Sequence, residues 1–520
     1  MQSLLTHSGP WCFALAVLLT TCSRNDSATV TADARVVTIH VSDRRQIIHN
    51  FGGSDAWACQ FVGQWPDAKR QQVADWLFSM EDDVDGKPQG IGLSLWRFNI
   101  GAGSAAQNNI DDEWRRAQGF LNADGSYTWT RQAGQQWFLD AARQHGVDQF
   151  VAFVNSPPVQ LTRNGKAYSG NGEQANISPE RYSDYAVFLA TVVKYFRDRG
   201  TTFTYLSPFN EPQWDWTGNG QEGSPYTNQE VYDITRKLDS VLMAEGLAIK
   251  IQLCEAGKMN YLYETADKPT RGNQVDDFFS PTSPRYVGSL KSVDKIISAH
   301  SYFTSAPMDQ MVAVRKAVDA KVKASPTPLE LWQSEYCVLG DQEEIPGAGK
   351  DRGMATALYV ARLVHHDLTV ANASAWHWWT SLSAYDYKDG LVYVAKNKTD
   401  GTVEDTKLLW ALGNFSRFVR PGSVRVAVSS ADVAIDNVRG LLVSAYVHDD
   451  THKLVTVVVN YGTDDVPLQL SVDGHTDVPV IAYITSAGAG EDLKPRPVQD
   501  SHDPVTIPGR SVVTLVSTLE

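Results

Sequence analysis

Short apolar runs alternate with helical patterns between about residues 46 and 380. The runs are almost continuously apolar, which is typical of strands covered on both faces of a parallel sheet. Eight of them occur, at residues 47–54, 93–100, 150–155, 203–210, 249–254, 296–302, 329–335 and 373–379. Eight strand–helix repeats predict an α/β fold, the (β/α)8 barrel of the TIM type, whose functional residues lie at the C-terminal ends of the strands.

Helix signals separate the apolar runs. After the third run, Ser178 is placed as an N-cap, Pro179 as the first helical residue and Gly200 as the C-terminal stop. After the fourth run, Thr227 and Glu230 have the spacing of a capping box, which predicts a helix to residue 245. Further helices are expected at residues 67–80, 133–143, 308–324 and 352–370.

The pattern changes after Trp410. Six alternating, β-branched segments follow, separated by turns rich in Gly, Asp and Asn, at residues 424–428, 440–447, 454–461, 468–472, 478–484 and 511–517. They predict an appended all-β sandwich domain over residues 411–520. Residues 36–41 alternate in the same way, so we expect the barrel region, residues 35–410, to begin with a strand that joins that domain.

The N-terminus has the features of an export signal. Residues 11–19 form an apolar stretch of signal-peptide length, too short to span a membrane. The stretch ends at Leu19-Thr20-Thr21-Cys22, which resembles the lipobox of bacterial lipoproteins. Residues 1–22 are therefore expected to be a signal peptide, Cys22 the lipidated residue and residues 23–34 a tether. Cys22 as an ordinary residue of a cleaved signal remains open. We expect the periplasm or the bacterial outer membrane and cell surface, with membrane contact only through Cys22.

Composition narrows the classes of partner. The net charge of −14 argues against nucleic acid, whose phosphates require a basic face. Cys59, Cys254 and Cys337 lie beyond the signal; their odd number and spacing give no disulfide framework and no zinc pattern, so buried free thiols are expected.

Two glutamates end apolar runs. Glu211 follows the fourth run in Asn210-Glu211-Pro212, and Glu335 ends the seventh. Two carboxylates that face one cavity are the minimum equipment for cleaving a glycosidic bond, since one protonates the leaving oxygen and the other attacks or activates water. Other strand ends carry polar and aromatic groups, namely Asp55, Trp57, Arg97, His300, Tyr302, Trp376 and Trp378.

With these ordered strand ends, the chain resembles glycoside hydrolase family 30 from about residue 40 to the C-terminus. The resemblance implies that Glu211 is the general acid/base and Glu335 the nucleophile of a retaining mechanism. It also implies that Asn210 hydrogen-bonds the sugar 2-hydroxyl. Glu211 must be protonated at rest, so its surroundings are expected to raise its pKa.

The remaining candidates follow from the same resemblance. Arg97 and Tyr302 are expected to hold Glu335 ionised and oriented, and His300 to bond to the acid/base or to a sugar hydroxyl. The candidates for direct sugar contact are Asp55 and the possible stacking platforms Trp57, Trp214, Trp216, Trp376 and Trp378. The loop carrying Trp214 and Trp216 follows Glu211 directly, which favours a substrate role for at least one of them.

The expected partner is a β-linked glycan. The sequence pattern of residues 51–57, 156–158 and 213–216 most resembles the endo-β-1,6-galactanase branch of the family. Open alternatives are an exo-acting β-fucosidase or β-galactosidase, a β-1,6-glucanase or a xylanase. An alternative of another class is a non-catalytic, glycan-binding surface lipoprotein.

No cofactor or metal is expected. Residues 101–106 match a dinucleotide fingerprint on paper, but a polar loop follows where the fingerprint needs a helix. His365 and His366 have no acidic partner at ligand spacing and are expected to form a pair on a helix surface.

Overall fold

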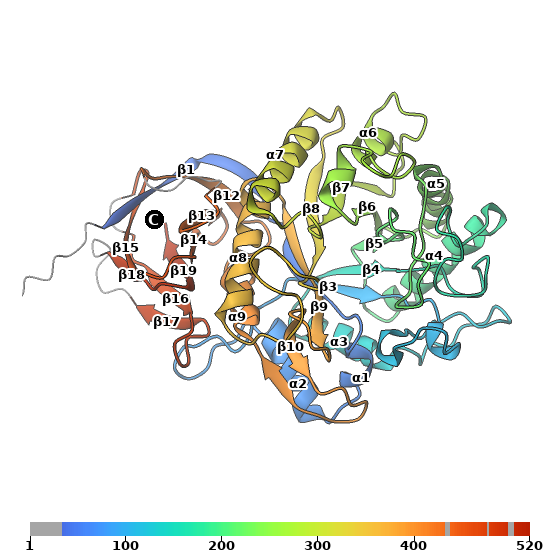
Figure 1. Ribbon diagram of the computed structural model, residues 1–520, viewed down its shortest axis with the longest axis horizontal. Coiled ribbons are helices and arrows are strands. Elements are labelled where there is room, and N and C mark those ends of the chain that lie inside the picture. Colours follow the sequence, from blue (N-terminus) through green and yellow to red (C-terminus); the bar gives the residue numbers. More distant parts are fainter. Residues whose placement is uncertain (1–33, 432–436, 476–477, 498–503, 520) are drawn as a thin grey trace, which may run out of the picture.

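A closed barrel and a β-domain make up the described chain (Figure 1). The computed structural model describes residues 34–431, 437–475, 478–497 and 504–519. The expected signal peptide, Cys22 and almost all of the tether lie outside these residues. No helix within the described residues has the length and apolarity to cross a membrane.

Eight parallel strands close the barrel, since β9 pairs with both β8 and β2. They are β2 (Asn50–Ser54), β3 (Leu95–Asn99), β4 (Gln149–Phe153), β5 (Tyr205–Ser207), β6 (Lys250–Ala256), β7 (Val293–His300), β8 (Glu330–Tyr336) and β9 (Ala375–Ser383). Each overlaps one of the eight apolar runs, so the predicted barrel is confirmed. Two short strands, β10 (Gly390–Val394) and β11 (Val403–Asp405), extend the sheet beyond β9 and were not predicted.

Helices follow most of the strands. They are α1 (Cys59–Val62), α2 (Asp67–Phe78), α3 (Ala133–Gln144), α4 (Tyr182–Arg197), α5 (Asn228–Ala244), α6 (Gln274–Phe279), α7 (Met308–Ala324), α8 (Met354–Thr369) and α9 (Lys407–Ser416), with 3-10 turns η1 (Ser104–Ala106), η2 (Glu113–Arg115), η3 (Pro179–Arg181) and η4 (Met259–Leu262). The capping box is present: the backbone N–H of Thr227 donates to Glu230 Oε2 at 2.8 Å, and that of Glu230 to Thr227 Oγ1 at 3.2 Å. The helix expected to start at Pro179 begins instead as η3, and α4 ends before Gly200.

The β-domain is built on one nine-stranded sheet. Its strands are β1 (Arg35–Ile47), β12 (Val424–Ser429), β13 (Leu441–His448), β14 (Lys453–Asn460), β15 (Val466–Val472), β16 (Ile481–Thr485), β17 (Lys494–Pro497), β18 (Val505–Ile507) and β19 (Ser511–Thr518). Strand β1 runs antiparallel to β12 and parallel to β15. The segment that precedes the barrel is therefore an internal strand of the second domain, as its alternation predicts.

Helices α8 and α9 lie between the barrel and the β-domain (Figure 1). The side-chain amide of Asn414 on α9 donates to the carbonyl of Tyr483 and to Thr514 Oγ1, both at 3.0 Å. Tyr446 and Val457 of the β-domain belong to the same apolar cluster as the barrel interior. The β-domain thus shares a core with the barrel, and the chain past residue 411 first completes α9 before the sandwich strands begin.

The expectation that His365 and His366 form a surface pair is wrong. Both side chains are buried, because α8 is covered by β9 on one side and by β13, β14 and β19 on the other. Burial lowers the pKa of His366 to about 4, so its imidazole is neutral at ordinary pH.

The shared core predicts that the barrel requires the β-domain. Truncation after Ser416 would expose the apolar faces of α8 and α9, so the shortened chain is expected to be insoluble, since large exposed apolar patches promote aggregation. Solubility and circular dichroism of the truncated chain, beside the full chain and one lacking only residues 1–33, measure this. A soluble, active barrel would show the two domains to be independent.

Candidate active site

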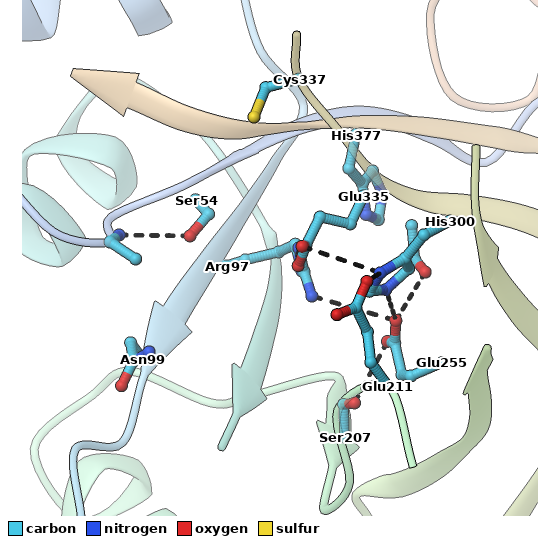
Figure 2. A network of polar contacts seen from close by, with 12 residues as sticks. Ser54, Arg97, Asn99, Ser207, Glu211, Glu255, His300, Glu335, Cys337 and His377 are labelled. Carbon is cyan, nitrogen blue, oxygen red and sulfur yellow. Dashed lines mark hydrogen bonds and ion pairs between the residues drawn. The ribbon is translucent and has the colours of Figure 1, made fainter. Parts of the chain in front are cut away.

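Glu211 and Glu335 face each other at the C-terminal end of the barrel (Figure 2). Glu211 lies four residues beyond the end of β5 at Ser207, in a backbone conformation with φ of 42°, which is strained for a residue with a side chain. Its N–H donates to the carbonyl of Glu255 at 3.0 Å, and its carbonyl accepts from Trp216 Nε1 at 3.1 Å. These two bonds fix the strained backbone that aims the carboxylate.

Glu335 lies within β8 and is held by one residue of β3 and one of the loop that follows β7. Arg97 Nη1, on β3, donates to Glu335 Oε2 at 3.1 Å, and the Tyr302 hydroxyl donates to Glu335 Oε1 at 3.3 Å. The Arg97 guanidinium is buried and lies 4.5 Å from the ring centroid of Phe153. Both contacts expected from the sequence are present.

His300, at the end of β7, bridges two carboxylates (Figure 2). Its Nδ1 lies 2.8 Å from Glu211 Oε1, which is the contact expected with the acid/base. Its Nε2 lies 2.8 Å from Glu255 Oε2.

Sequence reasoning missed Glu255. The predicted fifth run ends at Cys254, directly before Glu255, whereas β6 continues to Ala256 and carries this carboxylate inward. The available signal was the one used for Glu211 and Glu335, an acidic residue directly after an apolar run.

Burial and charge set the protonation of this cluster. Burial raises the pKa of Glu335, and the negative charges of Glu211 and Glu255 act in the same direction, against the cations His300 and Arg97. The expectation that Arg97 and Tyr302 would keep Glu335 ionised therefore needs correction, because desolvation is the larger effect on its pKa.

The pKa values of His300 and Glu255 shift in the direction opposite to the one that burial alone would give. Burial alone would lower the pKa of His300, but the charge of Glu335 and the hydrogen bonds to Glu211 and Glu255 raise it to about 10. Burial would raise the pKa of Glu255, but the hydrogen bond from His300 and the charge of Arg97 outweigh it and lower the pKa to about 2. Glu255 is thus an anion and His300 a cation at neutral pH.

Glu211, His300 and Glu335 are close enough to be tested as metal ligands. One donor atom from each lies within 4.8 Å of the others. A histidine binds metal as neutral imidazole, whereas His300 is held as an imidazolium between carboxylates. The donor set fits a proton-transfer site better than a metal centre.

A cavity of about 810 Å³ opens above the two carboxylates. Loops after β5, β7 and β8 line it, together with Trp379 of β9. Of the expected sugar contacts, Asn210, Trp214, Trp216 and Tyr302 line this cavity. Trp379 was missed, although it ends the eighth apolar run.

Trp376 and Trp378 do not reach the cavity, and their proposed stacking role is wrong. Both are buried; Trp376 Nε1 donates to Asp367 on α8 at 2.9 Å, and Trp378 Nε1 to the carbonyl of Asp389 at 2.8 Å. Side chains alternate along a strand, so these two face outward and Trp379 faces inward. The sequence indicates a cluster of tryptophans on this strand but not which of them face the cavity.

Asp55 and Trp57 also lie outside the cavity lining. Burial raises the pKa of Asp55 to about 8, and its Oδ1 accepts from the N–H of Asn99 at 2.9 Å. Trp57 packs edge-on against Trp379 with ring centroids 5.4 Å apart. Both are buried behind the wall of the site and do not line the cavity, contrary to expectation.

Paired acids at the C-terminal end of a (β/α)8 barrel, beneath an aromatic-lined cavity, are the arrangement of a glycoside hydrolase. Residues 34–393 match the model of O-glycosyl hydrolase family 30, and residues 422–515 match the β-sandwich domain of glycosyl hydrolase family 30. The chain belongs to glycoside hydrolase family 30 and is an O-glycosyl hydrolase.

Several known proteins are similar over most of the chain. An endo-β-1,6-galactanase of Hypocrea rufa is 23% identical, covering 86% of this chain and 87% of its own. A glucuronoxylanase of Bacillus subtilis is 24% identical, covering 97% and 96%. A conserved exported protein from Bacteroides fragilis, whose structure is solved, is 34% identical in sequence with a TM-score of 0.87. The match covers 93% of this chain and 100% of that one.

Because Trp376 and Trp379 lie on opposite faces of β9, their replacement is expected to affect different properties, stability and KM respectively. Trp376→Phe removes the donor to buried Asp367, so the free energy of unfolding is expected to fall by about 1–3 kcal/mol with KM unchanged. Trp379→Phe is expected to raise KM instead. Denaturant unfolding and steady-state kinetics of both variants measure this; a raised KM in Trp376→Phe with unchanged stability would contradict the assignment of faces.

Proposed function

We propose that the chain is a retaining β-glycoside hydrolase, with an endo-acting β-1,6-galactanase as its most specific assignment. The observation that carries retention is the distance between Glu211 and Glu335, which have oxygen atoms within 4.8 Å of each other. Retaining enzymes place their carboxyl groups about 5–5.5 Å apart, and inverting enzymes about 6.5–9.5 Å apart to admit a water.

The proposed reaction has two displacements. Glu335 attacks the anomeric carbon and forms a glycosyl ester, while Glu211 gives its proton to the departing glycosidic oxygen. Glu211 then takes a proton from water, whose oxygen attacks the anomeric carbon and releases Glu335 as carboxylate. The proton on Glu211 at rest remains a prediction.

Asn210 is placed to hold the sugar at this carbon. Its side chain lines the cavity beside Glu211, and its Oδ1 has no hydrogen-bond partner among the described residues. A buried amide oxygen without a partner is costly, so a donor from the substrate would satisfy it. This supports the proposed bond with the 2-hydroxyl.

An aromatic wall at the cavity rim supports action on a polymer. Trp214 and Phe303 lie with ring centroids 5.5 Å apart, and Phe303 is 66% exposed. Lys258 Nζ lies 5.3 Å from the Trp214 centroid and 5.4 Å from that of Phe303, which fixes the two rings from separate loops. A half-buried and an exposed ring beside the acid/base suit a sugar unit beyond the cleaved bond.

The galactan assignment rests on similarity. The endo-β-1,6-galactanase of Hypocrea rufa spans most of this chain, and the strand-end texture favours the same branch. Xylan is the second candidate, because the glucuronoxylanase of Bacillus subtilis covers 97% of the chain. A β-1,6-glucan remains an alternative through a structurally similar endo-β-1,6-glucanase, at a TM-score of 0.65.

Export with a lipid anchor at Cys22 remains part of the proposal. The structural similarity to a conserved exported protein supports export alone, and residues 1–33 lie outside the described residues. Labelled palmitate is expected to enter the protein and to be absent from a Cys22→Ser variant; equal labelling of both would exclude the anchor.

The two glutamates are expected to differ in their response to the leaving group. Glu335→Ala should nearly abolish turnover. Glu211→Ala should slow the cleavage of glycosides with poor leaving groups by about 100- to 10,000-fold. Formation of the glycosyl-enzyme from activated aryl glycosides should be slowed least, because good leaving groups need no proton. Rates for an aryl glycoside series measure this, and NMR of the first product gives the anomer. An inverted anomer would refute retention.

The sizes of the products released from three glycans test which substrate the protein cleaves. β-1,6-Galactan, β-1,6-glucan and xylan are each incubated with the protein and the products are sized. Oligosaccharides from galactan alone are expected. Release of only monosaccharide would indicate an exo-glycosidase, and inertness on galactan would overturn the specific assignment; a protein that binds these glycans but cleaves no aryl glycoside would be a binding protein.

A further inference from the structure

Glu255 is a charged group at the site that the proposed reaction does not use. It is buried and absent from the cavity lining, so it does not contact substrate. Its carboxylate accepts from Ser207 Oγ at 3.1 Å and from Ser334 Oγ at 2.6 Å, and its Oε2 lies 2.8 Å from His300 Nε2. Side chains from β5, β7 and β8 thus converge on it (Figure 2).

His300 meets a carboxylate oxygen at each ring nitrogen. A neutral imidazole has one N–H donor and one acceptor, so His300 can donate to a carboxyl oxygen at each ring nitrogen only when both nitrogens carry protons. Glu255 already accepts from two hydroxyl groups and lies 4.0 Å from Arg97 Nη2, so the Nε2 side of this bridge is anionic at neutral pH.

Resting on the proposed function, we infer that Glu255 is the positioning residue that holds His300 as an imidazolium against Glu211. The bridge leaves the two catalytic glutamates with one proton to share between them. Glu255 acts through His300 and is not itself a catalytic residue.

The charge balance of the cluster carries this inference. Glu211, Glu255 and Glu335 contribute three carboxyl groups, and Arg97 and His300 contribute two cations, with Arg97 Nη2 at 4.0 Å from Glu255. A buried cluster is least costly when neutral, which requires one proton on the three carboxyl groups. With Glu255 anionic, that proton resides on Glu211 or Glu335, the state in which one is an acid and the other a nucleophile.

The other titratable groups that face the cluster add no charge. His377 on β9 and Asp55 after β2 are uncharged at neutral pH, because burial lowers the pKa of His377 to about 3 and raises that of Asp55 to about 8. Burial raises the pKa of the Tyr302 hydroxyl and of the Cys254 and Cys337 thiols. The five charged side chains therefore set the proton count.

Glu255→Gln tests the inference, since it keeps the shape and removes the charge. Loss of an anion beside His300 makes every protonation in the cluster less favourable. Both limbs of the pH profile of kcat/KM are therefore expected to move to lower pH, by about one pH unit or more. At neutral pH, turnover of glycosides with poor leaving groups is expected to fall at least about tenfold.

Two further variants separate charge from shape. Glu255→Asp retains the anion, so its limbs are expected to lie nearer to those of the unaltered protein. Glu330→Gln is the matched control: Glu330 also contacts a histidine and a serine, His49 at 2.6 Å and Ser374 at 3.2 Å, but at the N-terminal end of β8. Its profile is expected to stay unchanged.

The outcomes are distinct from those of the proposed function. A folded Glu255→Gln protein with lower activity but unmoved limbs would make Glu255 merely structural and overturn the inference. If this variant does not fold, nitrogen NMR of the unaltered protein, with His300→Asn to assign the signal, decides: both His300 nitrogens protonated at neutral pH supports it, and a neutral ring overturns it. Failure of the proposed function appears separately, as an inverted product from the unaltered protein.

Discussion

A buried ion cluster is the constraint on which the active site depends. Arg97, His300 and three glutamates come from β3, β7, β6, β8 and the loop after β5, and all are buried. Uncompensated charge in such a setting is strongly destabilising, so each member requires the others. The barrel supplies the geometry because the C-terminal ends of its parallel strands meet in one ring.

The backbone around the cluster is shaped to serve it. Glu211 and Glu255 both have positive φ, 42° and 41°, and the N–H of Glu211 bonds to the carbonyl of Glu255. Strained residues of this kind persist only where their surroundings over-determine them. The hydrogen bonds from Trp216, Ser207 and Ser334 are the surrounding contacts that do so here.

Much of the fold is predictable from local pattern, because buried parallel strands and capped helices leave strong signals. The eight runs and the capping box at Thr227 locate the barrel, and alternation in residues 36–41 assigns β1 to the β-domain. Helix α9, which packs against the β-domain, and the short strands β10 and β11, which extend the barrel sheet beyond β9, were missed. His365 and His366 appeared polar enough for a surface, but the packing of a second domain on α8 has no local signal.

The active site also has residues that the sequence predicts and residues that it does not. Strand ends identify Glu211, Glu335, Arg97, His300 and Tyr302, because a polar group directly after an apolar run points to the cavity end. Which of Trp376, Trp378 and Trp379 faces inward depends on strand parity, and Glu255 depended on where β6 ends. Both are settled by single-residue register, which spacing alone does not give.

Trapping the covalent intermediate tests the central claim most directly. A 2-deoxy-2-fluoro glycoside with an activated leaving group slows release of the glycosyl-enzyme, so the intermediate accumulates when the nucleophile is an enzyme carboxylate. Intact mass followed by peptide mapping is expected to show one added fluoroglycosyl group, on Glu335. A label on Glu211 or Glu255, or inactivation-free turnover with an inverted product, would contradict the account.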